Sequence, residues 1–170
     1  MKKILFALAS IICNPLFSAQ LGNITSINEQ NNEFEIKTSD GTVTKIIFYR
    51  PDIFRIWVGP NGQLTDPASE EETAIVVYDD NPIRVNQSEE NDYYKIESDA
   101  IVLRIYKNPC MFSLYEKDNS TLLFEENKPI TYGAETYQSI NRNSDDYFYG
   151  CGMQNGHFCH NDRNIQIENI

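Results

Sequence analysis

The feature that most constrains this chain is the alternation of apolar and polar residues within short segments. Phe34 and Ile36 alternate with polar neighbours, and Ile101, Leu103 and Ile105 share one face of another segment. A period of two residues is that of a half-buried β-strand, whereas an amphipathic helix repeats at 3.6 residues. No window of about 11 residues or more shows the helical period. The sequence therefore predicts an all-β fold.

The predicted strands are short, and they lie at a spacing of roughly ten residues. They cover residues 34–37, 43–49, 53–58, 74–78, 94–96, 101–106, 111–115, 121–124 and 147–149. Polar turn residues separate them, as in the hairpin turn Ser39-Asp40-Gly41 and at Asn108-Pro109. Short strands arranged in this way are typical of a β-sandwich or a β-barrel. The chain is long enough for one domain with a core of its own.

The first residues have the pattern of a secretory signal. Lys2 and Lys3 precede an apolar run from Ile4 to Ile12, Asn14-Pro15 breaks any helix, and Phe17-Ser18-Ala19 ends in small residues before Gln20. The run is too short to cross a bilayer, which takes about 20 residues. We expect cleavage near Ala19, so that residues 1–19 are a signal peptide and the mature protein is exported to a periplasm or to the outside of the cell.

The chain is strongly acidic, and this limits its partners. It has 14 basic and 25 acidic residues, with a net charge of −11. The expected cleavage removes two of the basic residues and none of the acidic ones, which leaves a net charge of −13. Such a balance repels phosphate backbones and anionic lipid, so we expect neither nucleic acid nor a membrane surface as a partner. A neutral partner such as a sugar is compatible with it.

Two segments resemble a known family. One runs from Tyr93 to Tyr115, and the other runs from Asp146 to Gly156 and contains Phe148-Tyr149-Gly150-Cys151-Gly152. In that order they resemble the N-terminal domain of glycoside hydrolase family 31, and the resemblance extends over residues 24–170. It implies that residues 20–170 form an antiparallel β-sandwich of the galactose-mutarotase-like type. Many members carry Glu after the second glycine of the motif, whereas this chain has Met153, which indicates a divergent branch.

The resemblance also implies a function. Family members cleave or transfer at α-glycosidic bonds with retention, using two aspartates on a (β/α)₈ barrel that follows this domain. A barrel takes about 250 residues, and none remain after Ile170, so we expect no catalytic residue and no turnover in this chain alone. Asp145 and Asp146 are not a substitute pair, because neighbouring residues on a strand point to opposite faces. We interpret them as a turn.

The resemblance implies an accessory role in which the domain packs on its catalytic barrel, absent from this chain, and lends a loop to the sugar site. Gln154, Asn155 and His157 are the candidate substrate-binding residues, because amide and imidazole groups both donate and accept hydrogen bonds with sugar hydroxyls. Gly150 and Gly152 are interpreted as a tight bend before them. An ordinary surface loop is the alternative reading of this segment. For the whole chain, the alternatives are a free-standing secreted carbohydrate-binding module and an enzyme that uses acids on the sandwich.

Four residues near the C-terminus raise the question of a metal site or a disulfide. They are Cys151, His157, Cys159 and His160. Their spacing does not match the short knuckles of structural zinc sites, so we expect no metal, and nothing else indicates a cofactor. A disulfide between Cys151 and Cys159 is compatible with an exported protein, and buried free thiols are the other interpretation.

Overall fold

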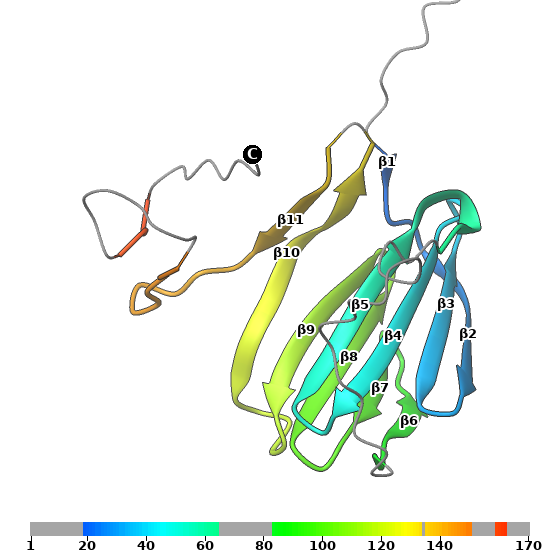
Figure 1. Ribbon diagram of the computed structural model, residues 1–170, viewed down its shortest axis with the longest axis horizontal. Coiled ribbons are helices and arrows are strands. Elements are labelled where there is room, and N and C mark those ends of the chain that lie inside the picture. The colour runs from blue at the N-terminus through cyan, green and yellow to red at the C-terminus, as the bar shows by residue number, and fades with distance from the viewer. Residues whose placement is uncertain (1–18, 65–82, 134, 151–158, 163–170) are drawn as a thin grey trace, which may run out of the picture. The chain divides into compact units, whose positions relative to one another are not determined.

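The computed structural model of the chain describes residues 19–64, 83–133, 135–150 and 159–162. The chain divides into two compact units, Met1–Ile140 and Asn141–Ile170. All described strands belong to the first unit (Figure 1), and the described helical structure is one 3-10 turn at Pro60–Gly62. Among the described residues, no helix is long and apolar enough to cross a membrane. The predicted all-β class is confirmed.

The first sheet has four antiparallel strands in the order of the sequence. They are β2 (Ile24–Gln30), β3 (Glu33–Thr38), β4 (Val43–Arg50) and β5 (Ile53–Gly59). Asn31 and Asn32 form the turn between β2 and β3 with positive φ at both positions, which suits a two-residue hairpin loop. Three of these strands are among those predicted, whereas the alternation in β2 was too weak to reveal it.

The second sheet is larger and is also antiparallel. Its strands are β1 (Ala19–Gln20), β6 (Asn86–Glu89), β7 (Tyr93–Glu97), β8 (Ile101–Lys107), β9 (Cys110–Glu116), β10 (Leu122–Tyr132) and β11 (Tyr137–Ile140). The order is β1-β10-β9-β8-β7-β6, and β11 pairs with β10. Four predicted strands lie here, and β10 is longer than predicted. The strand predicted at residues 74–78 lies outside the described residues.

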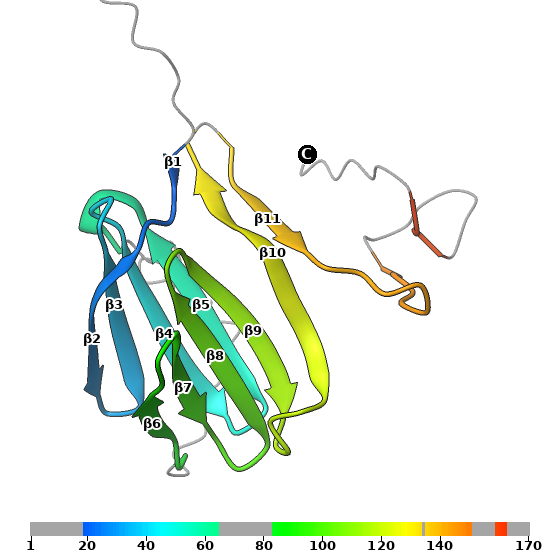
Figure 2. The ribbon, with the colours of Figure 1, turned by 180° about the vertical axis from the view of Figure 1, so that it is seen from behind.

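The two sheets pack face to face within the first unit (Figures 1 and 2). Phe34, Ile36 and Ile46 from the first sheet and Leu103 and Phe112 from the second are fully buried in one hydrophobic core. Burying one such side chain contributes about 1.5–3 kcal/mol to folding. The sheets therefore hold together through their apolar faces, as the alternation requires, and the antiparallel β-sandwich is confirmed.

A carboxylate in the turn between β3 and β4 joins the two sheets at one end. Asp40 accepts hydrogen bonds from the Gly22 amide at 2.8 Å and from the hydroxyls of Thr42 and Tyr132, and Tyr132 belongs to β10 of the other sheet. Burial by itself raises the pKa of Asp40, but hydrogen bonds from Thr38, Thr42, Tyr132 and Gly22 outweigh it and hold the pKa well below its ordinary value.

A buried carboxylate joins the middle of β10 to its neighbours. Glu126 is only 2% exposed, and it accepts hydrogen bonds from the Phe112 amide of β9 at 2.9 Å and from Gln138 Nε2 of β11 at 2.7 Å. Burial raises the pKa of Glu126, and the bonds from Gln138 and Phe112 only partly oppose that shift. The register of β10 and β11 shifts between Glu126 and Lys128, so the carboxylate supports the pairing where the regular ladder is interrupted.

Candidate functional site

The candidate site lies in the second unit, of which residues 141–150 and 159–162 are described. The predicted substrate-binding residues Gln154, Asn155 and His157 lie outside the described residues, and their role stays a prediction. The structure does describe the two segments from which this loop begins and ends. The site can therefore be built from its base.

Backbone and side-chain hydrogen bonds hold the two ends of the loop together. The His160 amide donates to the Phe148 carbonyl at 2.8 Å. Asn161 bonds the same segment twice, because its Oδ1 accepts from the Phe148 amide at 3.0 Å and its Nδ2 donates to the Asp146 carbonyl at 2.7 Å. The chain thus leaves Phe148 and returns beside it at His160. We call these contacts the loop base.

Gly150 turns the chain out of the loop base, as the bend interpretation predicts. Its φ is +108°, a conformation that residues with a Cβ rarely adopt. His160 Nε2 lies 3.1 Å from the Gly150 carbonyl oxygen, so the histidine contacts the bend with its side chain and Phe148 with its backbone amide. The second glycine of the motif, Gly152, lies outside the described residues.

Three consecutive aromatic residues precede the bend and are exposed. Tyr147, Phe148 and Tyr149 have 64%, 51% and 54% of their surface accessible. The rings of Tyr147 and Tyr149 stack with centroids 6.5 Å apart. The prediction of a strand over residues 147–149 is wrong: this segment has no continuous ladder, because Phe148 bonds an amide side chain on one side and a single backbone amide on the other.

Asp145 and Asp146 form a turn, which confirms the interpretation made from the sequence. Asp146 Oδ2 accepts from the Asn143 amide at 2.7 Å, and the Asp146 amide donates to the Asn143 carbonyl at 3.2 Å. Arg142 and Asp162 add an ion pair of 2.9 Å between the two described segments. These acids therefore shape the base of the loop.

The cysteines of the described residues are free thiols. Cys110 is fully buried in the core, and burial, with smaller effects of Glu126 and Asp40, raises its pKa to about 12. Cys159 lies in the second unit with its Sγ 3.3 Å from Asn161 Oδ1. Cys151 lies outside the described residues. Within the described ranges, no three His, Cys, Asp or Glu side chains gather closely enough to hold a metal ion.

Asn161 is the residue whose importance sequence reasoning missed. Two of its contacts, with Phe148 and Asp146, depend on a segment that lies more than ten positions earlier in the chain, and spacing alone gives no indication of them. The one available signal is chemical, since a short amide side chain readily bonds nearby backbone groups. Asp162 follows it with a positive φ, which places a turn immediately after the loop base.

Comparison with known sequences now connects this geometry to a family. A profile described as the glycosyl hydrolase 31 N-terminal galactose mutarotase-like domain matches residues 43–170. The match covers three quarters of the chain and includes β4 to β11, the loop base and the loop. The chain belongs to this family. No curated protein matches the sequence.

Solved structures share the fold of this family 31 domain. A variant of the family 31 dextranase of Flavobacterium johnsoniae, in complex with isomaltotriose, has a TM-score of 0.75 at 19% identity over 85% of this chain and 18% of its own. The cycloalternan-forming enzyme of Listeria monocytogenes, in complex with a pentasaccharide substrate, has a TM-score of 0.66 at 15% identity over 83% of this chain and 14% of its own. The family 31 domain thus spans less than a fifth of either enzyme.

Proposed function

We propose that this chain is the accessory N-terminal domain of a retaining α-glycosidase or transglycosidase. It packs on a catalytic (β/α)₈ barrel and lends the loop that follows Gly150 to the sugar site. The family match through the Phe148–Gly152 motif carries the proposal. It is supported by two sugar-bound enzymes in which the same sandwich fold is a small part of the chain.

The loop base supports the proposed contact with sugar. It fixes both ends of the segment with hydrogen bonds, so that binding a ligand costs less conformational entropy than it would in a free loop. Gln154, Asn155 and His157 lie between those ends and carry donors and acceptors for hydroxyl groups. Tyr147 and Tyr149 supply exposed aromatic faces beside the bend, which suit the apolar faces of sugar rings.

Exposed apolar side chains favour an accessory domain over a free-standing module. In the first unit Leu122 and Leu123 of β10 are 43% and 50% exposed, and Tyr137 and Ile140 of β11 are 58% and 45% exposed. They are spread along the two paired strands, since Ile140 pairs with Glu126 and Tyr137 with Thr131, and exposed apolar surface along an element often marks a contact with another domain. We propose that β10 and β11 meet the barrel through these four side chains. A free-standing carbohydrate-binding module remains the second candidate, and it requires this edge to stay open to solvent.

Export is part of the proposal, because the basic residues, apolar run and small residues before Gln20 follow the order of a secretory signal. The processed protein would begin at Gln20 and act on sugars in a periplasm or outside the cell. N-terminal sequencing of the protein recovered from the medium or periplasm tests this. An N-terminus at Met1 in the recovered protein would contradict it.

The functional test uses the protein in which this domain is joined to its barrel. Gln154→Ala, Asn155→Ala and His157→Ala should each lower turnover or sugar affinity from a few-fold to about tenfold, because a hydrogen bond contributes about 0.5–1.5 kcal/mol net. Asn91→Ala, in an exposed turn of the first unit, is the matched control and should leave the kinetics unchanged. Kinetics of all three loop variants equal to those of the parent protein would reject the role of the loop.

A further inference from the structure

The outer face of the four-stranded sheet has two rows of side chains that run across all four strands. Phe34, Ile36 and Ile46 point into the core, so their neighbours along each strand point outward. The first row consists of Asn28, Glu35, Lys45 and Trp57, which are paired directly across β2, β3, β4 and β5. The second row consists of Gln30, Glu33, Ile47 and Arg55.

These rows enclose a shallow depression over β2, β3 and β4. Its volume is about 220 Å³, and it is lined by Asn28, Gln30, Glu33, Glu35 and Lys45. Two amides, two carboxylates and one ammonium group thus surround one hollow. Together they offer both donors and acceptors, which matches a ligand rich in hydroxyl groups.

Charges in and beside this depression are balanced when Lys37, which lies next to the lining, is counted with Lys45, although the chain as a whole carries −11. Lys45 Nζ lies 2.6 Å from Glu33 Oε2, and Lys37 Nζ lies 3.5 Å from Glu35 Oε1. Each carboxylate therefore has a lysine beside it. The small net charge would attract a metal cation or a phosphate only weakly, whereas the binding of a neutral ligand does not depend on net charge.

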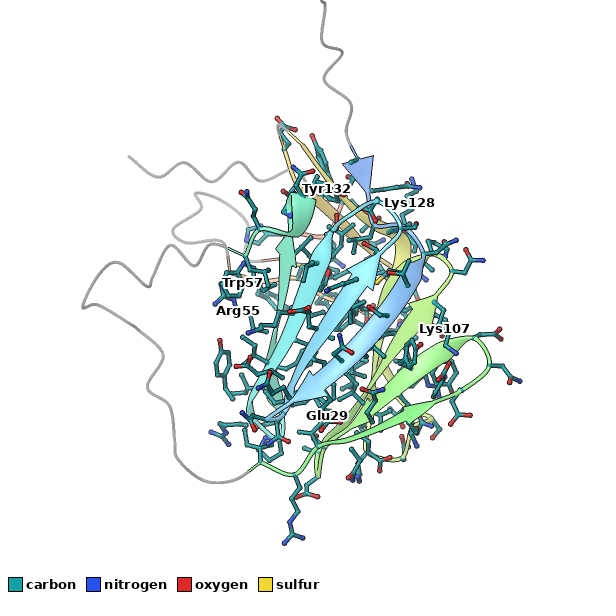
Figure 3. The ribbon with its side chains drawn as sticks, turned by 90° about the vertical axis from the view of Figure 1, so that its right-hand side faces the viewer. Glu29, Arg55, Trp57, Lys107, Lys128 and Tyr132 are labelled. Atoms are coloured by element: carbon teal, nitrogen blue, oxygen red, sulfur yellow. The ribbon has the colours of Figure 1, made fainter. Side chains whose placement is uncertain are left out.

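An aromatic side chain adjoins the depression on the side of β5. Trp57 is the only tryptophan of the chain, and its direct partner across the strands is Lys45. Arg55 and Trp57 lie side by side on β5 (Figure 3), with the guanidinium carbon 4.4 Å from the centre of the indole ring. The cation orients the ring. Trp57 and the β3 side chains are two strand spacings apart, about 10 Å.

We propose that this face binds a neutral oligosaccharide. One sugar unit occupies the depression, with its hydroxyls on Asn28, Gln30 and the two carboxylates, and the adjoining unit rests against Trp57. The proposed site uses no residue of the loop after Gly150 and none of the barrel. The class of ligand agrees with the proposed function, but the site follows from the sheet face alone. Two contact points at this separation require more than one sugar unit.

The test is a titration of the full chain with isomaltotriose, in which binding is measured by isothermal calorimetry and by changes in amide chemical shifts. Saturable binding should shift resonances of β2 to β5, and glucose should bind more weakly than the trisaccharide. Asn28→Ala and Gln30→Ala should each raise the Kd about two- to tenfold. Trp57→Leu, which keeps an apolar side chain but removes the ring, should raise it up to about tenfold.

Asn86→Ala is the matched control, because Asn86 is also an exposed amide on an edge strand but belongs to the other sheet. It should leave the Kd unchanged. The inference is overturned if no saturable binding occurs, or if Asn86→Ala and Asn28→Ala have the same effect. It is also overturned if binding responds only to Gln154→Ala, an outcome that would support the proposed loop site. Additional protection of β2 to β5 from hydrogen exchange in the barrel-joined protein, compared with the same strands in this chain alone, would overturn the inference and assign this face to domain packing.

Discussion

Replacing Asp40 by Asn should remove a large part of the acid sensitivity of this domain. The Asp40 carboxylate accepts hydrogen bonds from Gly22, Thr42 and Tyr132, and its pKa is held well below the ordinary 3.8 despite burial that acts to raise it. A folded-state pKa below the unfolded one contributes stability above the unfolded value. That contribution is lost as the pH falls from about 5 towards the folded-state pKa.

The magnitude follows from the bonds that the charge receives. Hydrogen bonds to a charged group contribute about 1.5–3 kcal/mol each when they are shielded. Asp40 is an exposed turn residue, so solvent screening reduces their sum. We expect Asp40→Asn to lower the free energy of unfolding by about 2 kcal/mol at neutral pH and by less at about pH 3, which lies below the unfolded-state value of 3.8, so that the parent carboxylate has lost part of its advantage there.

Urea unfolding of the parent and the variant at both pH values measures this difference. Asp52→Asn is the control, because Asp52 is also an exposed turn residue but only pairs with Arg50 at 3.3 Å. Its effect should stay below about 0.5 kcal/mol at either pH. An effect of Asp40→Asn that is independent of pH, or no larger than that of Asp52→Asn, would refute the reasoning.

Three further predictions concern the core, the thiols and the activity. Glu126→Ala should destabilise the domain by about 1–3 kcal/mol in urea unfolding, because it leaves the buried Phe112 amide without a partner. Burial raises the pKa of Glu126 above its unfolded value of 4.5, so ionising this carboxyl group should lower the free energy of unfolding as the pH rises above 4.5. A free energy of unfolding that instead rises above pH 4.5, and no longer does so in Glu126→Gln, would contradict this. In the native protein Cys110 should resist alkylation and Cys159 should react. In denaturant without reductant Cys110, Cys151 and Cys159 should all react, and labelling of one cysteine alone would establish a disulfide and contradict the prediction. Purified chain should release no aryl group from aryl α-glycosides, and heat-labile release that survives repurification would contradict the accessory role.

Much of the fold can be predicted from local patterns, as the strands around Phe34 and Leu103 illustrate. Alternation identifies them because the pleat sends successive side chains to opposite faces, whatever the partner strand is. Alternation does not identify β6 and β11, because their largely exposed residues show little change between apolar and polar side chains. The prediction of a strand at residues 147–149 was wrong because three aromatic residues have the propensity of a strand, whereas the contacts of Phe148 are those of a loop base and form no ladder.

The candidate site divides in the same way. The motif around Gly150 identifies the family and the position of the bend from residue types alone, and the positive φ of that glycine confirms the bend. The contacts of Asn161 at the loop base could not be predicted from the sequence, because they join residues that are more than ten positions apart and that no local pattern connects. The loop residues Gln154, Asn155 and His157 remain predictions from their chemistry.

By itself the sequence determined most of the strands that build the core, which face of each is apolar, and where polar turns interrupt them, because backbone sterics and side-chain alternation are local. Only the tertiary structure decided which strands are neighbours. It placed Tyr132 on Asp40, 92 residues away, and aligned Trp57, Lys45, Glu35 and Asn28 in one row. Strand pairing and register depend on how whole apolar faces close on one another, and a shift of one residue would turn every side chain of that row into the core.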